Sequence, residues 1–271
     1  MSETRHRVLL TGASGAIGSE TAKLLAVRGA HLALSGRRAG RLEELAAEIE
    51  AGGSERPVVI TADLSRRGEA TRLADEARSA LGAVDVLINN AGGSVQGLTW
   101  AVGDRDEARA MMETNLWSPF ALAAALAPEM LERGTGAIVN VGSMARISPF
   151  PHLGHYSASR AALSTATQVL AMELAPRGIR VVEVALGPVD SPASRENRRL
   201  AGADAWLDGR PGLGRPESAA RAIADAAIGD ARGVTYYPRA LRFADRFPGL
   251  GRRYSRRTAR GADLGDETVR A

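Results

Sequence analysis

The sequence predicts an α/β protein: a Rossmann-like, doubly wound, mainly parallel sheet of seven strands with helices on both faces. Short apolar runs alternate along the 271 residues with longer segments whose apolar residues recur every three or four positions. The short runs are almost continuously apolar, which is typical of parallel strands buried on both faces. Together, these two observations favour a layered α/β fold over a helical bundle or a β-sandwich.

The expected elements follow one another as strand and helix. Strands are expected at 7–11, 31–35, 57–61, 84–89, 137–141, 180–185 and 234–237. Amphipathic helices fill the intervals between them, at 16–28, 39–51, 66–81, 104–114, 118–132, 155–175 and 216–228. We therefore expect a single catalytic domain over residues 1–238.

Two segments do not follow this alternation. Residues 186–215 are rich in Gly, Pro, Ala and Arg and follow a strand, so we interpret them as a lid over a ligand. Residues 239–271 form an Arg-rich extension with nine arginines and four acidic residues, whereas the rest of the chain carries a net charge of −1.

The extension has several interpretations. Arginines can neutralise phosphates, and the apolar residues among them have a roughly helical spacing suited to a lipid surface: Ala240, Phe243, Phe247 and Leu250. We favour a packed or oligomer-contacting extension over nucleic-acid or membrane binding. No recognised nucleic-acid-reading motif accompanies the charge, and a Pro and two Gly residues interrupt the helical pattern at 248, 249 and 251.

Composition excludes several functional classes. The chain has no cysteine, so it has neither a disulfide nor a thiolate metal site, and its four histidines are too scattered to suggest another metal site. The N-terminus begins with charged residues, and the apolar stretch that follows is too short for a signal peptide. A cytoplasmic protein without a metal is the expectation.

A glycine-rich turn follows the first expected strand and opens the first helix. It reads TGASGAIG over residues 11–18. Glycines let the backbone approach a pyrophosphate, and the helix N-terminus offers unpaired N–H groups. We favour nucleotide binding over a merely structural turn, with contacts from Gly12, Ser14, Gly15, Ile17 and Gly18.

The end of the second strand indicates which nucleotide binds. An NAD-selective protein usually has a carboxylate there, but this chain has Arg37 and Arg38. Guanidinium groups suit the 2′-phosphate of NADP(H), which is therefore the expected cofactor. The alternative is that both arginines form only a solvated face, because the chain uses Arg throughout and has a single Lys, Lys23.

Small and polar residues end the next two strands. Asp63 and Leu64 follow the third strand, where adenine is expected, and Asn90, Ala91 and Gly92 follow the fourth, where a ribose is expected. Such residues are common in turns, so the prediction rests on their placement at successive strand ends.

A second group of residues suggests proton transfer. Tyr156 and Arg160 are four residues apart on an expected helix and share a face, so the cation favours ionisation of the phenol. Ser143, thirteen residues before Tyr156, can donate a hydrogen bond to the same substrate oxygen. Asn115 can order a water molecule for a proton relay.

With these motifs in this order, the sequence resembles the classical short-chain dehydrogenase/reductase family over about residues 5–238. The resemblance implies that Tyr156 is the general acid/base, Ser143 orients the carbonyl and Asn115 supports a water relay. It also implies that the turn Gly187, Pro188 and Val189 faces the nicotinamide. Oligomerisation as a homodimer or homotetramer, through the helices at 118–132 and 155–175, is implied as well.

The chain departs from the family at Arg160, where the family has a Lys that binds the nicotinamide ribose. Arg keeps the positive charge but is bulkier and does not release a proton. Three functions therefore stay open: an NADPH-dependent carbonyl reductase or its reverse, a non-redox isomerase, dehydratase or cyclase, and a regulatory NADP-binding protein with weakened catalysis.

The loop between Ser143 and Tyr156 is expected to wall the substrate pocket. Its apolar character indicates a hydrophobic ketone or alcohol, with substrate contacts from Ser143, Met144, Phe150 and Tyr156. A less favoured interpretation has arginines bind an anionic part of the substrate: Arg146, Arg195, Arg198 and Arg199.

Overall fold

The seven strands form one parallel sheet in the order β3-β2-β1-β4-β5-β6-β7. A computed structural model describes residues 5–192, 194–195 and 213–259. The strands are β1 (Arg7–Thr11), β2 (His31–Gly36), β3 (Val58–Thr61), β4 (Val86–Asn89), β5 (Gly136–Ser143), β6 (Ile179–Leu186) and β7 (Gly233–Tyr237). The predicted doubly wound fold is confirmed.

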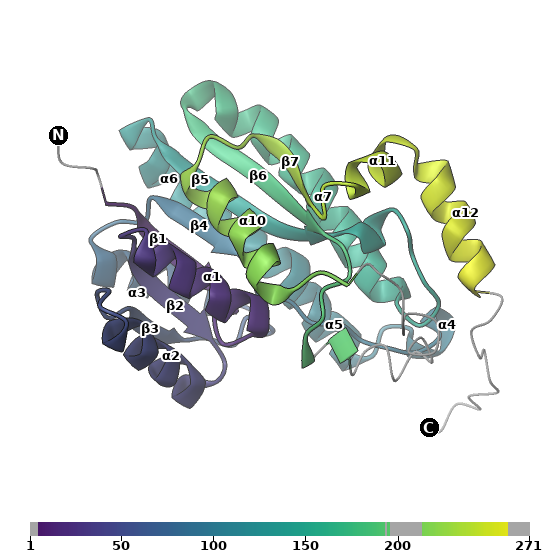
Figure 1. Cartoon of the computed structure of the whole chain (residues 1–271), viewed down its shortest axis with the longest axis horizontal. Coiled ribbons are helices and arrows are strands. Elements are labelled where there is room, and N and C mark those ends of the chain that lie inside the picture. Colours follow the sequence, from purple (N-terminus) through teal and green to yellow (C-terminus); the bar gives the residue numbers. More distant parts are fainter. Residues whose placement is uncertain (1–4, 193, 196–212, 260–271) are drawn as a thin grey trace.

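Helices cover both faces of the sheet (Figure 1). One layer contains α1 (Ala16–Val27), α2 (Ala39–Ala51) and α10 (Pro216–Ile228), and the other contains α3 (Glu69–Leu81), α6 (Ser118–Arg133) and α7 (Gly154–Leu174). Successive strand residues point to opposite layers. In β1, for example, Val8 and Leu10 pack in the first layer and Leu9 in the second. Both faces are therefore buried, as the apolar strand sequences predict.

The order of the strands determines where a ligand can bind. Because the winding reverses between β1 and β4, a crevice forms at the carboxyl ends of these neighbouring strands. The predicted strands agree with the observed ones to within two residues at either end. The residues expected to bind the cofactor therefore lie along one edge of the sheet.

The segment between β4 and β5 differs from its prediction. It contains α4 (Thr99–Val102) and α5 (Asp106–Met112), and a π-helical turn (Glu113–Trp117) joins α5 to α6. The predicted helix at 104–114 is thus shorter and passes into this wider turn. Such turns often occur at functional sites, and this one carries Asn115.

The extension contains two helices, α11 (Leu241–Arg246) and α12 (Pro248–Ala259). The helical pattern is interrupted at Phe247, immediately before Pro248, but the expectation that Gly249 and Gly251 interrupt it is wrong, because both glycines lie in α12. Pro248 occupies the first position of α12, where its missing N–H costs no hydrogen bond. A Cβ at Gly251 would lie 2.6 Å from Ser148 Oγ, so glycine permits close packing there.

Most of the lid expected at residues 186–215 lies outside the residues that the structure describes, which do not include 193 and 196–212. In the part that the structure describes, a short bridge joins Val189 to Gly214. Among the described residues, no helix has the length and apolar character required to cross a bilayer.

Candidate functional site

The glycine-rich turn is shaped by close backbone contacts. Gly12 has a φ of +66°, and a Cβ there would lie 2.8 Å from the Ala91 Cα. A Cβ at Gly18 would overlap the Gly12 carbonyl oxygen. Side chains are therefore excluded at both positions, which leaves the backbone open toward the N-terminus of α1.

Hydrogen bonds fix this turn to the end of β4. Thr11 Oγ1 accepts from the backbone N–H groups of Asn90 and Ala91, each at 3.0 Å, and donates to the Ile88 carbonyl at 3.2 Å. Asn90 Nδ2 donates to the Thr11 carbonyl at 2.9 Å. Asn90 and Thr11 thus hold the ends of β1 and β4 together.

The two arginines after β2 have different surroundings. Arg38 donates from Nη2 to the backbone carbonyl of Ser14, which places its guanidinium on the glycine turn. The Arg37 side chain is exposed. Two arginines and no carboxylate therefore follow β2 directly, and one of these arginines contacts the glycine turn.

The residues after β3 form a local turn. Asp63 Oδ1 accepts from the Ser65 N–H at 3.2 Å and from the Ser65 hydroxyl at 2.8 Å. Leu64 is buried, and its carbonyl accepts from Ser118 Oγ at 2.8 Å. The carboxylate of Asp63 therefore already stabilises its own turn through one oxygen.

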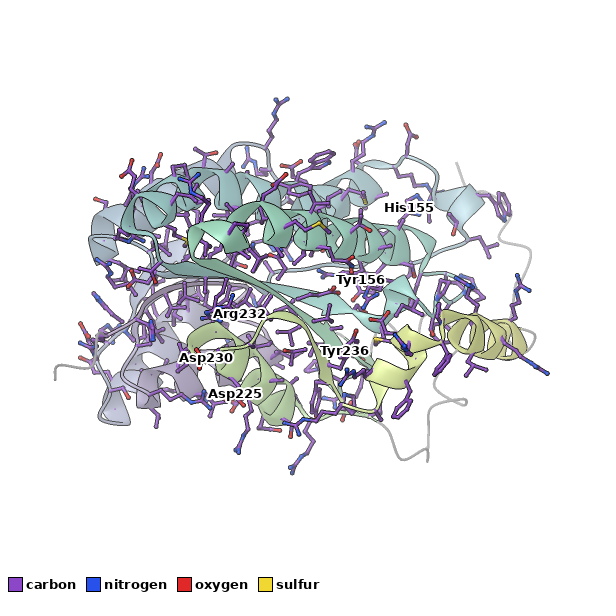
Figure 2. All side chains as sticks on the ribbon, turned by 90° about the horizontal axis from the view of Figure 1, so that it is seen from above. His155, Tyr156, Asp225, Asp230, Arg232 and Tyr236 are labelled. Atoms are coloured by element: carbon purple, nitrogen blue, oxygen red, sulfur yellow. The ribbon has the colours of Figure 1, made fainter. Side chains whose placement is uncertain are left out.

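Tyr156 and Arg160 lie together on α7, as their spacing predicts. The Arg160 Cζ lies 5.3 Å from the centroid of the Tyr156 ring, which is a cation–π arrangement. Arg160 Nη1 donates to the Val141 carbonyl in β5 at 3.2 Å. Figure 2 shows Tyr156 on the side of α7 that faces the sheet. A positive charge is thus fixed beside the phenol.

Arg160 is buried, and its larger head group fits because residue 92 is a glycine. A Cβ at Gly92 would overlap Arg160 Nη2. Arg160 Nε is buried without a hydrogen-bond partner among the described residues. An unpartnered buried N–H costs free energy and is a natural place for a ligand oxygen.

Asn115 connects the loop after β4 to α7. Its Oδ1 accepts from the Gly93 N–H at 2.9 Å, and its Nδ2 donates to the Gly93 carbonyl at 2.9 Å and to Ser159 Oγ at 3.0 Å. Ser159 in turn donates to the Tyr156 carbonyl at 2.8 Å. Asn115 therefore positions the first turn of α7, which carries Tyr156. The water relay through Asn115 stays a prediction.

Ser143 lies at the end of β5, two residues beyond the carbonyl that Arg160 contacts. Its Oγ accepts from the Ala145 N–H at 3.2 Å and caps the short 3₁₀ turn Met144–Arg146. As an acceptor in this bond, Ser143 keeps its hydroxyl proton for a substrate oxygen. Met144 packs with Ile147 and Ala185 in a small apolar cluster, whereas Phe150 is half-buried.

The turn predicted to face the nicotinamide is held by the neighbouring strand β7 and by Gly214. The Gly187 N–H donates to the Tyr237 carbonyl at 2.8 Å, and the Pro188 carbonyl accepts from the Gly214 N–H at 2.8 Å. A Cβ at Gly187 would lie 2.7 Å from a methyl group of Leu241. Helix α11 therefore packs directly behind this turn.

A buried charge network adjoins the site, and the sequence reasoning did not find it. Arg146 donates from Nε to Glu183 Oε1 at 3.1 Å and to both oxygens of Asp245, at 3.0 and 2.6 Å. Glu183 also accepts from Ser164 at 2.7 Å, and the Tyr236 hydroxyl donates to Asp245. The network joins β6, the turn after Ser143, α7, β7 and α11. Figure 2 shows Tyr236 beside α11.

The pKa values in this network reflect burial and pairing. Burial raises the pKa of Glu183, and the positive charge of Arg146 offsets this only in part. Burial and the hydrogen bond to Asp245 raise the pKa of Tyr236 to about 12. Burial also opposes ionisation of Asp245, but the hydrogen bonds from Arg146 and Tyr236 keep its pKa below the usual value. In the sequence, a buried pair of this kind is indicated by Glu183, the single carboxylate within the apolar strand sequence VVEVAL.

Of the arginines considered for an anionic substrate, the two that the structure describes both pair with carboxylates. Arg146 is neutralised by two carboxylates, so its expected role in binding an anion is not supported. Arg195 pairs with Asp190 at 3.0 Å. Arg198 and Arg199 lie outside the described residues.

A parallel sheet with a glycine-rich turn at its switch point defines a dinucleotide-binding α/β protein of the Rossmann type. The sequence model of the family described as short chain dehydrogenase matches residues 6–201. This chain therefore belongs to the short-chain dehydrogenase family of oxidoreductases, and the resemblance in the sequence is confirmed.

Named relatives support this assignment. Nodulation protein G of Rhizobium sp. (strain N33) is 37% identical over 188 residues, which are 69% of this chain and 75% of that protein. A 3-oxoacyl (acyl-carrier-protein) reductase from Agrobacterium tumefaciens, solved with NADP bound, has a TM-score of 0.77 and 27% identity, covering 86% of this chain and 92% of that one. A short-chain dehydrogenase from Sphingobium yanoikuyae in complex with NADPH has a TM-score of 0.75 and 29% identity, covering 93% and 94%.

Proposed function

We propose that this protein is an NADPH-dependent reductase of a hydrophobic ketone, or the corresponding alcohol dehydrogenase. The observation that carries the proposal is the Tyr156 ring beside the buried guanidinium of Arg160, at the end of β5 where Ser143 lies. A phenol beside a fixed cation, with a hydroxyl donor nearby, suits proton transfer to a carbonyl oxygen.

The residues of the site fit NADP(H). The turn around Gly12 and Gly18 has no room for side chains, Arg38 places a cation on that turn, and buried Arg160 Nε lacks a partner among the described residues. We assign the pyrophosphate to the turn, the 2′-phosphate to Arg37 and Arg38, and the nicotinamide ribose to Arg160. When bound, the reduced cofactor supplies a hydride.

In the proposed reduction, the carbonyl carbon gains the hydride and the oxygen gains the proton of the Tyr156 hydroxyl, which yields the alcohol. Ser143 donates a hydrogen bond to that oxygen as its negative charge develops. The charge of Arg160 stabilises the phenolate left on Tyr156. Asn115 positions the first turn of α7 through Gly93 and Ser159 and supports the return of a proton from water.

The substrate is proposed to be apolar. Met144 and Phe150 lie on the loop between Ser143 and Tyr156, and the arginine of that loop, Arg146, is neutralised by two carboxylates. One structural neighbour is named for 3-oxoacyl reduction, and an acyl chain with a keto group is a ketone of this kind.

A panel of ketones tests the proposal directly. The full-length protein is mixed with NADPH and with aliphatic, aromatic and 3-oxoacyl ketones, and the loss of NADPH absorbance is followed. We expect consumption with apolar ketones. NADPH binding without consumption across the panel would instead support a regulatory or non-redox role. The hydrogen bond from Arg160 to the Val141 carbonyl is compatible with that role, because it gives Arg160 a structural partner.

Arg38→Ala is expected to weaken NADPH binding roughly tenfold and to leave NADH binding within about twofold. The change removes one exposed, charge-assisted contact to a 2′-phosphate, and only NADPH has that group. Fluorescence titration with both cofactors measures the effect, and Arg41→Ala, one helical turn away, is the control. Equal losses for NADPH and NADH would contradict the assignment of the 2′-phosphate to Arg38.

Arg160→Lys is expected to raise the kcat of ketone reduction about tenfold. A lysine ammonium is a compact charge that is free to turn toward the ribose, whereas the guanidinium is bound to the Val141 carbonyl and stacked on Tyr156. Steady-state kinetics at saturating NADPH measures the change. An unchanged or lower kcat would show that Arg160 is not a weakened substitute for lysine.

We also propose one catalytic domain over residues 1–238, a cytoplasmic location, and assembly as a homodimer or homotetramer through α6 and α7. Exposed apolar side chains beside and on these helices support the last proposal: Trp117 is 55% exposed and Met172 is 71% exposed.

A further inference from the structure

Helices α11 and α12 form an arm at one end of the molecule, beyond the α/β layers (Figures 1 and 2). One side of the arm is fixed to the body. Leu241 and Ala244 pack on the cluster around Met144, Asp245 binds Arg146, and Gly251 packs against Ser148. The arm is therefore held in a defined orientation, and its other side faces solvent.

The solvent-facing side carries large apolar side chains. Phe243, Phe247 and Leu250 are 74%, 54% and 64% exposed. The spacing of these residues predicts a packed extension, but their exposed fractions show that these three side chains do not pack against the protein. They lie on α11, at the joint between the two helices and on α12, within eight residues of one another, and exposed apolar side chains gathered in this way are typical of an interaction surface.

Arginines surround these apolar residues. Six of them have exposed side chains: Arg239, Arg242, Arg246, Arg252, Arg253 and Arg256. None of the six pairs with a carboxylate among the residues that the structure describes, and Asp245, the acidic residue within α11, is already occupied by Arg146 and Tyr236. Arg239 and Arg242 also line an open hollow of about 620 Å³ with Val234, Thr235 and Tyr236.

We propose that this arm binds the surface of an anionic lipid bilayer. The apolar side chains would enter the boundary between headgroups and acyl chains, and the guanidiniums would contact lipid phosphates. Long Arg side chains can lie along apolar surface while their charge stays at the headgroups. Helix α4, with Trp100 70% exposed, lies at the same end of the molecule in Figure 1 and adds a residue type that favours this boundary.

Charge favours lipid over a second copy of the chain. A two-fold contact would bring the same surface of two copies together, so the arginines of one would face those of the other. The rest of the chain, with a net charge of −1, offers no excess of carboxylates to balance them. A nucleic acid would satisfy the arginines, but it would gain little from the aliphatic Leu250.

One consequence rests on the proposed function. Because Gly251 packs against Ser148, the arm adjoins the loop that is proposed to wall the substrate site. A protein held on a bilayer by this arm would therefore take its apolar ketone from the lipid phase. Binding of the arm to lipid does not depend on the reaction, so it is tested without substrate.

Flotation with vesicles tests the surface. The full-length protein is mixed with phosphatidylcholine vesicles or with vesicles containing about one-third phosphatidylglycerol. We expect co-flotation with the anionic vesicles alone and release by 0.5 M KCl, because salt screens the contacts. Failure to float with anionic vesicles at low salt would overturn the proposal.

Two variants separate the apolar and charged parts. Phe243→Ser/Phe247→Ser/Leu250→Ser should lower vesicle affinity at least tenfold, whereas Val27→Ser, which alters an exposed apolar residue of α1, should not. Arg242→Gln/Arg246→Gln/Arg253→Gln should lower it roughly 100-fold. Its control, Arg67→Gln/Arg177→Gln/Arg221→Gln, makes the same change in net charge at exposed positions away from the arm and α4.

Three results would overturn the proposal. The control variants could lose as much affinity as the arm variants, which would indicate a general charge or solubility effect. The apolar variant could reduce the oligomeric state on a sizing column while vesicles bind neither form, which would indicate a contact between copies. Binding of a labelled single-stranded oligonucleotide without vesicle binding would indicate a nucleic-acid surface. Circular dichroism melting of each variant verifies that it is folded.

Discussion

Replacing Tyr156 with Phe is expected to lower the kcat of NADPH-dependent ketone reduction roughly 1,000-fold, because the substitution removes the proton donor to the carbonyl oxygen. The aromatic ring stays, so its stacking with Arg160 and the position of the guanidinium are kept. The NADPH dissociation constant should therefore change by less than about twofold. Stopped-flow loss of NADPH absorbance measures the first quantity and fluorescence titration the second.

A matched variant distinguishes proton transfer from folding. Tyr237→Phe removes a phenol that accepts a hydrogen bond from the exposed N–H of Arg215 at 3.2 Å, outside the proposed proton path. We expect it to keep kcat within about threefold. If Tyr156→Phe retained turnover while binding NADPH normally, Tyr156 would not be the proton donor to the carbonyl oxygen.

Replacing Arg146 with Met is expected to lower the free energy of unfolding by about 3 kcal/mol, because it leaves the buried carboxylate of Glu183 without its cation. Glu183 is 1% exposed, so solvent cannot replace the lost partner. Urea denaturation at pH 7 measures the change. The double variant Arg146→Met/Glu183→Gln should recover most of it, since the amide is neutral and can still bind Ser164.

The loss in Arg146→Met should also depend on pH. Burial raises the pKa of Glu183, so ionising it costs stability, and this cost is absent below about pH 4.5, where the carboxyl is protonated both folded and unfolded. Arg146 also lowers the pKa of Asp245, a contribution to stability that is present at neutral pH and lost in acid. The Glu183 effect makes the deficit larger at pH 8 than at pH 5, whereas the Asp245 contribution is equally present at both values and is lost only below about pH 4.

A control variant makes this prediction specific. Arg109→Met breaks the pair with Asp104, in which the side chains are 68% and 89% exposed, and should leave the free energy of unfolding nearly unchanged. A deficit of the same size in both variants, or one that shrinks as pH rises, would show that the buried pairing of Glu183 is not the cause.

Much of the proposed site follows from the sequence because its residues lie at strand ends. Strand periodicity predicts where β1, β2 and β4 end, and a parallel sheet brings these ends to one edge. The glycine turn, Arg38 and the segment from Asn90 to Gly92 were therefore predicted to lie near one another. The pairing of Tyr156 with Arg160 follows from their separation by one helical turn.

Other contacts were not predictable in this way. Arg146 lies 37 residues before Glu183 and 99 before Asp245, and no periodic pattern links such distant positions. The sequence suggested Arg146 as an anion-binding residue, because a lone arginine in a loop has no visible partner. The π-helical turn that carries Asn115 was also missed, and the Asn115 side chain binds Gly93 and Ser159, which lie 22 and 44 residues away in the chain.

The sequence by itself determined the parallel α/β layers, the glycine cradle and the order of the candidate catalytic residues, because these depend on local periodicity and on spacing within one turn or helix. The tertiary structure alone decided that Arg146 is buried against two carboxylates, that Gly92 leaves room for Arg160, and that Phe243, Phe247 and Leu250 face solvent. Burial and pairing of a side chain depend on neighbours distant in the chain, and folding brings those neighbours together.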